Sequence, residues 1–130
     1  MKVSKLTLNL MVVNIEETIA FYEQYFNAKL LVKVPETGST DFAMVQIDDI
    51  TLMFQTVKSA TSETKIFEGV SLGGSFMLYL DVDNAAQWHE KLTGVLPIIH
   101  ELHKTFYNTY EFTVQDINGY IITFAQDIKE

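Results

Sequence analysis

One stretch, residues 6–26, constrains the fold most, because in it a strand runs directly into a capped helix. Leucine or valine stands at every second position from 6 to 12, while Thr7, Asn9 and Met11 fall on the other face of the strand. Asn14 is suited to cap the helix that follows, and a glutamate stands three residues later, as in a capping box. The helix is expected to cover the leucine face through an apolar stripe of Ile19, Tyr22, Tyr25 and Phe26. The functional question is therefore what the face of Thr7, Asn9 and Met11 contacts.

The same arrangement recurs in the second half of the chain. Residues 76–82 alternate in the same way, with Met77, Tyr79 and Asp81 opposite the apolar face. A cap from Asp83 or Asn84 then begins a second helix, whose stripe ends before a glycine and consists of Ala85, Trp88, His89 and Leu92. We therefore expect each half to contain a strand, a helix and three further strands.

The remaining strands are expected at 29–34, 41–47 and 50–57 in the first half and at 96–101, 109–115 and 120–126 in the second. Asp48-Asp49 and Asn118-Gly119 are expected to be the turns of two hairpins. Residues 58–74 are rich in Ser, Thr and Gly, which predicts an irregular connector that could serve as a lid. The chain is expected to be a single domain with half-repeats at roughly 1–57 and 75–130.

Composition excludes several classes of protein. The 130 residues are 48% apolar, which is enough for a substantial core, and no apolar run reaches the ~20 residues of a membrane span. The formal charge of -8 argues against nucleic acid or an anionic membrane as a partner. The absence of cysteine excludes disulfides and thiolate chemistry. No signal peptide is recognisable, so a cytoplasmic location is expected.

Two such units predict an α+β fold in which two βαβββ modules form a curved, cup-like mixed sheet with helices on the outer face. Each unit has one sheet face covered by its own helix and a second face left open. Two units side by side can then curl the open face into a shared cup.

Three segments carry a resemblance to a known family: residues 13–22 (VNIEETIAFY), 82–86 (VDNAA) and 112–120 (FTVQDINGY). They resemble the first helix start, the second helix start, and the closing strand and turn of the glyoxalase, bleomycin-resistance and extradiol-dioxygenase group, the vicinal oxygen chelate superfamily. Asn14 stands where aspartate is usual and Ile117 where the turn has proline. Since asparagine also caps helices, both departures are conservative for structure. The resemblance extends over nearly the whole chain and implies the paired-module fold.

The resemblance also implies where a metal would be held, with one ligand from each of the first and last strands of each half. The corresponding positions are Thr7, Met53, Met77 and Thr123, with Gln55 as an alternative to Met53. None of them is His, Asp or Glu, the ligands that hard divalent ions prefer. We therefore expect no metal and no other cofactor.

The alternation of the strands predicts which residues line the cup. Apolar residues at positions 52, 54, 122 and 124 are expected to face the helices. The expected small-molecule site is mostly apolar with a few polar groups; its residues are Thr7, Asn9, Met53, Gln55, Met77, Tyr79, Asp81 and Thr123, beside Met11 and Ile121. Buried amides and hydroxyls without partners would each cost ~1–3 kcal/mol, so water or a ligand is expected to satisfy them. The alternative, that these side chains fill the cup by packing on one another, stays open.

Histidines are the remaining route to a metal or a base. His100 and His103 lie near Glu101 and Glu111, but a spacing of three on a strand predicts that the two rings point to opposite faces. Neither occupies a position that corresponds to a ligand in the family, so we expect surface or rim histidines. His89, on the second helix, is expected to be a packing residue.

Three functions stay open. The missing ligands favour a metal-free protein, similar to the bleomycin-resistance branch, that binds a small, largely apolar molecule in the sheet cup or a dimer cleft. The alternative is an enzyme of the same superfamily, a lyase, isomerase or dioxygenase, with a displaced metal site or with Asp81, Glu111 or His100 as acid or base. The third is a domain that acts only through protein contacts. A homodimer is expected, because open sheet edges are commonly covered by pairing.

Overall fold

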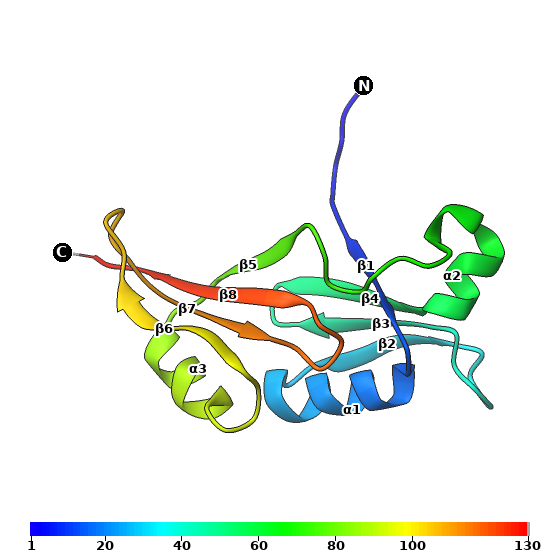
Figure 1. Cartoon of the computed structure of the whole chain (residues 1–130), viewed down its shortest axis with the longest axis horizontal. Coiled ribbons are helices and arrows are strands. Elements are labelled where there is room, and N and C mark those ends of the chain that lie inside the picture. The colour runs from blue at the N-terminus through cyan, green and yellow to red at the C-terminus, as the bar shows by residue number, and fades with distance from the viewer. Residues whose placement is uncertain (130) are drawn as a thin grey trace. The chain divides into compact units, whose positions relative to one another are not determined.

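The computed structural model describes residues 1–129, which divide into two compact units, residues 1–70 (unit 1) and the chain from Ser71 onward (unit 2). Unit 1 contains β1 (Leu8–Val12), α1 (Ile15–Phe26), β2 (Lys29–Val34), β3 (Phe42–Ile47), β4 (Ile50–Thr56), α2 (Val57–Glu63) and a 3-10 helix, η1 (Lys65–Phe67). Unit 2 contains β5 (Met77–Asp81), α3 (Ala85–Leu92), β6 (Ile98–Lys104), β7 (Thr109–Gln115) and β8 (Ile121–Asp127) (Figure 1).

Each unit is built on a four-stranded mixed sheet with the same topology. The strand order is β1-β4-β3-β2 in unit 1 and β5-β8-β7-β6 in unit 2. The first strand pairs in parallel with the last one, and the other pairs are antiparallel. This repetition confirms the prediction of two βαβββ modules in an α+β fold.

Asparagine caps begin the principal helix of each unit, as the sequence predicted. The Asn14 side chain accepts a hydrogen bond from the backbone N–H of Glu17 at 2.9 Å, and Asn84 accepts one from the N–H of Gln87 at 3.1 Å. Each bond satisfies a donor that the first turn of a helix leaves free. The first strand of each unit is thus followed at once by a fixed helix start.

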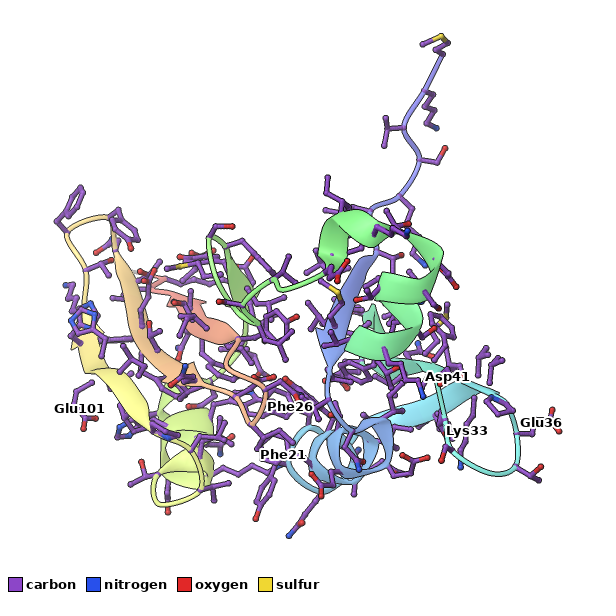
Figure 2. The ribbon with its side chains drawn as sticks, turned by 45° about the vertical axis from the view of Figure 1, so that its right-hand side comes forward. Phe21, Phe26, Lys33, Glu36, Asp41 and Glu101 are labelled. Atoms are coloured by element: carbon purple, nitrogen blue, oxygen red, sulfur yellow. The ribbon has the colours of Figure 1, made fainter. Side chains whose placement is uncertain are left out.

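Aromatic packing attaches α1 to one face of the sheet in unit 1. Tyr22 is 1% exposed, and its ring lies 5.4 Å from that of Phe54 on β4. Leu10, Val12 and Leu52 are buried on the same side, as the alternation predicted. Figure 2 labels Phe21 and Phe26 on α1, and both are largely buried.

In unit 2 the corresponding attachment is a stack of rings between α3 and the sheet. Trp88 stacks on Phe124 with ring centroids 5.2 Å apart, and Phe112 lies parallel to Phe124 at 4.7 Å. The His89 ring meets Phe112 edge-on at 5.2 Å, and its Nε2 lies 2.8 Å from a carboxylate oxygen of Glu101. The predicted packing role of His89 is thereby confirmed, together with an ion pair at the surface.

The prediction of an irregular connector over residues 58–74 is wrong in its first part, where α2 forms. Thr56 caps this helix by accepting a hydrogen bond from the N–H of Ser59 at 3.1 Å, and Ala60 is buried. A Ser- and Thr-rich segment thus becomes helical because it has a cap and a surface to pack on. The half-repeat boundaries at 1–57 and 75–130 stay a prediction.

Several predicted strand limits need correction. Four strands differ from the prediction by one residue at one or both ends: β3, β4, β5 and β8. The differences are larger at β1 and β6. Leu6 lies outside β1 and is 82% exposed, and β6 runs from Ile98 to Lys104 rather than over 96–101. Within residues 1–129 no helix has the length and apolar character needed to cross a membrane.

Candidate functional site

In unit 1, the sheet face opposite α1 carries a short chain of neutral hydrogen bonds. Asn9 Nδ2 donates to Gln55 Oε1 at 2.8 Å, and Gln55 Nε2 donates to Ser59 Oγ at 3.0 Å. Ser59 comes from α2, which packs against β1 and β4 on the side away from α1 (Figure 1). Gln55 is consequently only 8% exposed, and both ends of its amide have partners.

The corresponding face of unit 2 brings together four of the predicted residues. Tyr79 pairs with Thr123 across β5 and β8, and Met77 lies one step along the same face, 3.9 Å from the Thr123 hydroxyl. Met77 and Tyr79 are 58% and 51% exposed, whereas Thr123 is buried. Asp81, at the end of β5, lines a hollow of about 650 Å³ whose other residues include Asp83, Tyr110, Gln126 and Asp127.

The expectation that water or a ligand must satisfy the buried polar groups is wrong for Gln55 and Thr123. The Thr123 hydroxyl lies 2.8 Å from that of Thr113, and Gln55 is bonded as described. Sequence alternation places these side chains on a face but does not reveal that their neighbours provide partners.

Thr7 lies just before β1 and is half-buried, and Met53 pairs with Asn9 in the register of β4 and β1.

A divalent metal does not fit the family's ligand positions in this chain. Thr7 and Met53 in unit 1, and Met77 and Thr123 in unit 2, offer only hydroxyl and thioether donors. Among residues 1–129, no group of three or more His, Asp or Glu side chains is arranged to hold a metal ion. No step that depends on a metal is therefore assigned to these positions.

The most elaborate polar cluster is in unit 2 and surrounds Glu111 on β7. This side chain is 7% exposed and accepts hydrogen bonds from three hydroxyl groups. Tyr79 and Thr109 donate to Oε2 at 2.5 and 2.8 Å, and Tyr107 donates to Oε1 at 3.0 Å. Tyr79 comes from β5 and Tyr107 from the turn between β6 and β7, so the carboxylate joins three parts of unit 2.

The direction of the hydroxyl bonds follows from the number of protons available. Thr109 donates its single hydroxyl proton to Glu111. In the 2.7 Å hydrogen bond between the Thr105 and Thr109 hydroxyls, Thr105 is therefore the donor. Thr105 Oγ1 in turn accepts from the Thr109 backbone N–H at 3.0 Å. The donors therefore point toward the carboxylate, as expected around an ionised group.

The pKa values reflect this cluster. Burial by itself raises the pKa of Glu111, but the hydrogen bonds from Tyr79, Thr109 and Tyr107 outweigh burial and hold the pKa below its usual range. The hydrogen bond to Glu111, followed by burial and the carboxylate charge, raises the pKa of Tyr79. Burial and the same carboxylate raise the pKa of Tyr107. At neutral pH the cluster holds one negative charge and two neutral phenols.

The predicted separation of the two histidines is wrong, because the rings of His100 and His103 lie on each other, 4.1 Å between centroids. The register of β6 against β7 pairs His100 with Thr113 and His103 with Glu111, so β6 contains one extra residue here. Such a bulge changes the alternation and brings a spacing of three onto one side. The His103 Nδ1 lies 2.8 Å from the Glu101 carbonyl oxygen, which can only accept, so Nδ1 carries the proton.

Tyr79 is among the predicted site residues, whereas Glu111 is predicted only as an alternative acid or base and Tyr107 is not predicted. A signal for Glu111 was present, because it alternates with Phe112 and Val114, both buried beneath the helix. This alternation places Glu111 on the sheet face away from the helix, which is the face that also carries Tyr79. No comparable signal exists for Tyr107, since it lies in a turn whose conformation alternation does not describe.

The fold and the ligand positions define a protein of paired βαβββ modules without the usual metal donors. The chain belongs to the Glyoxalase/Bleomycin resistance protein/Dioxygenase superfamily, whose family model matches residues 6–124. No curated protein matches the chain by sequence.

Several solved structures are similar in fold. TioX from Micromonospora sp. ML1 is 17% identical, with a TM-score of 0.71 and coverage of 97% of this chain and 100% of TioX. A family enzyme from Burkholderia phytofirmans PsJN is 17% identical, with a TM-score of 0.77 and coverage of 94% and 97%. Lactoylglutathione lyase from Agrobacterium tumefaciens is 15% identical, with a TM-score of 0.73 and coverage of 97% and 95%. At these identities the likeness establishes the fold.

The pH dependence of stability should change when Glu111 is replaced with Gln. Because folding lowers the pKa of Glu111, the unfolded chain takes up a proton first, and stability is lost as pH falls below ~4.3 toward the folded pKa. Glu111→Gln should remove this part of the acid dependence and lower the free energy of unfolding at pH 7 by about 1 kcal/mol. Urea unfolding at pH 7 and pH 3 measures both effects. Glu101→Gln, at a side chain 75% exposed, is the control and should retain the dependence of the wild type.

Proposed function

We propose that this protein is a metal-free member of its superfamily that binds a small, largely apolar molecule on the sheet face opposite the helix. The observation that carries the proposal is the set of residues at the metal positions, Thr7, Met53, Met77 and Thr123. Thioether and hydroxyl groups are poor ligands for hard divalent ions, but methionine provides an adaptable apolar surface.

Unit 2 has the features expected of the binding surface. Met77 and Tyr79 are about half-exposed on a face whose polar groups include Thr123, Glu111 and Asp81. An apolar surface with a few polar groups is the usual composition of a small-molecule site. In unit 1, α2 already contacts the corresponding region through Ser59 and Gln55.

One observation supports a second candidate, an enzyme that uses acid and base residues without metal. His103 carries its proton on Nδ1, so Nε2 of the neutral ring has a free lone pair, and its partner across the strands is Glu111. A base opposite a carboxylate that holds two phenols is an arrangement that can transfer protons. Turnover that His103→Gln abolishes would favour this candidate over simple binding.

Metal content tests the proposal directly. Purified protein should contain no stoichiometric divalent metal. A metal bound to the folded state would raise the melting temperature, and a chelator would then lower it. We expect chelators to leave the melting temperature unchanged. Elemental analysis and thermal melts with and without EDTA are the measurements. A tightly bound ion at close to one per chain would overturn the metal-free proposal.

We also propose a cytoplasmic homodimer. The absence of cysteine is compatible with a reducing compartment. The edge strand β2 has exposed apolar side chains, which a partner would cover: Leu30, Leu31, Val32 and Val34. Sedimentation at micromolar concentration should give twice the monomer mass, and a clean monomer would count against the dimer.

Met77→Glu should abolish ligand binding, because it places a charge on the apolar part of the site. Its position is 58% exposed and away from the buried Phe124 stack, so the free energy of unfolding should change little. A fragment screen by protein-observed NMR should give hits that shift signals around Met77 and Tyr79 in the wild type but not in the variant. Ile117→Glu, in an exposed turn, adds the same charge and should retain the hits. Hits confined to other surfaces would refute the binding proposal.

A further inference from the structure

Glu111 carries a buried negative charge that no lysine neutralises. Its side chain is 7% exposed, and the one ion pair among residues 1–129 joins His89 to Glu101. The three hydroxyl groups bound to Glu111 donate hydrogen bonds but bring no positive charge. A carboxylate withdrawn from water favours a nearby cation, because the protein interior screens charge weakly.

Two aromatic rings stand beside this carboxylate. The hydroxyls of Tyr79 and Tyr107 reach different oxygens of Glu111, at 2.5 and 3.0 Å, which fixes both rings around one charge. The residues nevertheless remain 51% and 52% exposed, so a molecule can reach them from solvent. The faces of such rings attract cations through their quadrupole, and the carboxylate adds its own attraction.

The neighbouring histidine does not replace the missing cation. His103 is the partner of Glu111 across β6 and β7, but its Nδ1 proton is donated to the Glu101 carbonyl. The groups that bind the Glu111 carboxylate directly are therefore three hydroxyl dipoles.

We propose that Tyr79, Tyr107 and Glu111 form a binding site for the charged nitrogen of a small organic ammonium ion. The apolar body of the ion lies on the adjacent surface of Met77, on the same strand as Tyr79. This inference rests on the proposed function and names the class of ligand, an organic cation with an apolar body. The formal charge of -8 on the chain also attracts cations from solution.

A matched pair of probes tests the role of charge. 2-Phenylethylammonium and 2-phenylethanol share a body and differ in the charge of the polar end. With the full chain at pH 8 and low salt, the ammonium ion should bind about tenfold more tightly than the alcohol. NMR titration gives both affinities, and signals of Tyr79 and Tyr107 should shift on binding.

Two variants and a control locate the effect. Glu111→Gln keeps the shape of the side chain and should lower the affinity for the ammonium ion several-fold, toward that for the alcohol, because only the attraction of the rings remains. Glu101→Gln removes the same charge from β6, the edge strand on which Figure 2 labels Glu101, and should leave the affinity unchanged. If Glu111→Gln does not fold, Tyr107→Leu removes one ring and should weaken ammonium binding more than alcohol binding.

The outcomes separate this inference from the proposed function. Equal affinities for both probes, ammonium binding at another surface, or binding that Glu111→Gln leaves unchanged would each overturn the cation site. If neither probe binds but neutral fragments bind around Met77, the cation site is also wrong while the proposed function stands. If no fragment binds there, the proposed function itself fails.

Discussion

The burial of one sheet face beneath a helix is the interaction on which the other features of each unit depend. In unit 1 this is the contact of Tyr22 with Phe54, and in unit 2 it is the stack of Trp88, Phe124 and Phe112. Such aromatic pairs contribute ~0.5–1.5 kcal/mol beyond the burial of their area. Because side chains alternate along a strand, fixing these rings on one side also fixes which residues face the other side. The candidate site is thus positioned by residues that do not belong to it.

Alternation and capping were sufficient to predict the fold. Asn14 and Asn84 cap the helices, and β2 and β7 have the predicted limits. The sequence could not predict α2, because its Ser- and Thr-rich composition favours a loop until Thr56 caps it and β1 and β4 provide a surface. The site was predicted only in part, since alternation identifies a face but not the contacts made on it.

The histidine pair illustrates why those contacts escaped prediction. One extra residue in β6 brings His100 and His103 together, and no local signal in the sequence marks that bulge. The hydroxyl of Tyr107 reaches Glu111 through the conformation of the turn between β6 and β7. Both features depend on the backbone geometry of a few residues. The alternation of side chains along a strand, which has a period of two residues, does not predict the geometry of a bulge or a turn.

The two units have the same topology but different polar groups on the sheet face opposite the principal helix. In unit 1 the chain from Asn9 through Gln55 to Ser59 is neutral, and each of the two amides donates to the next group. In unit 2 the donors converge on one carboxylate, whose charge remains. A repeated fold has therefore acquired two unlike surfaces, which is how one architecture can serve different ligands.

The contact between α2 and Gln55 has a consequence for competition. Ser59 is only four residues from Gln55 along the chain, so its effective concentration at the amide is high. A ligand that binds the same amide competes with the hydroxyl of Ser59. The ligand must also form a hydrogen bond in place of the one between Gln55 and Ser59. A molecule can reach this amide only where the Gln55–Ser59 hydrogen bond opens, so α2 leaves the amide less accessible than the exposed side chains of Met77 and Tyr79 in unit 2.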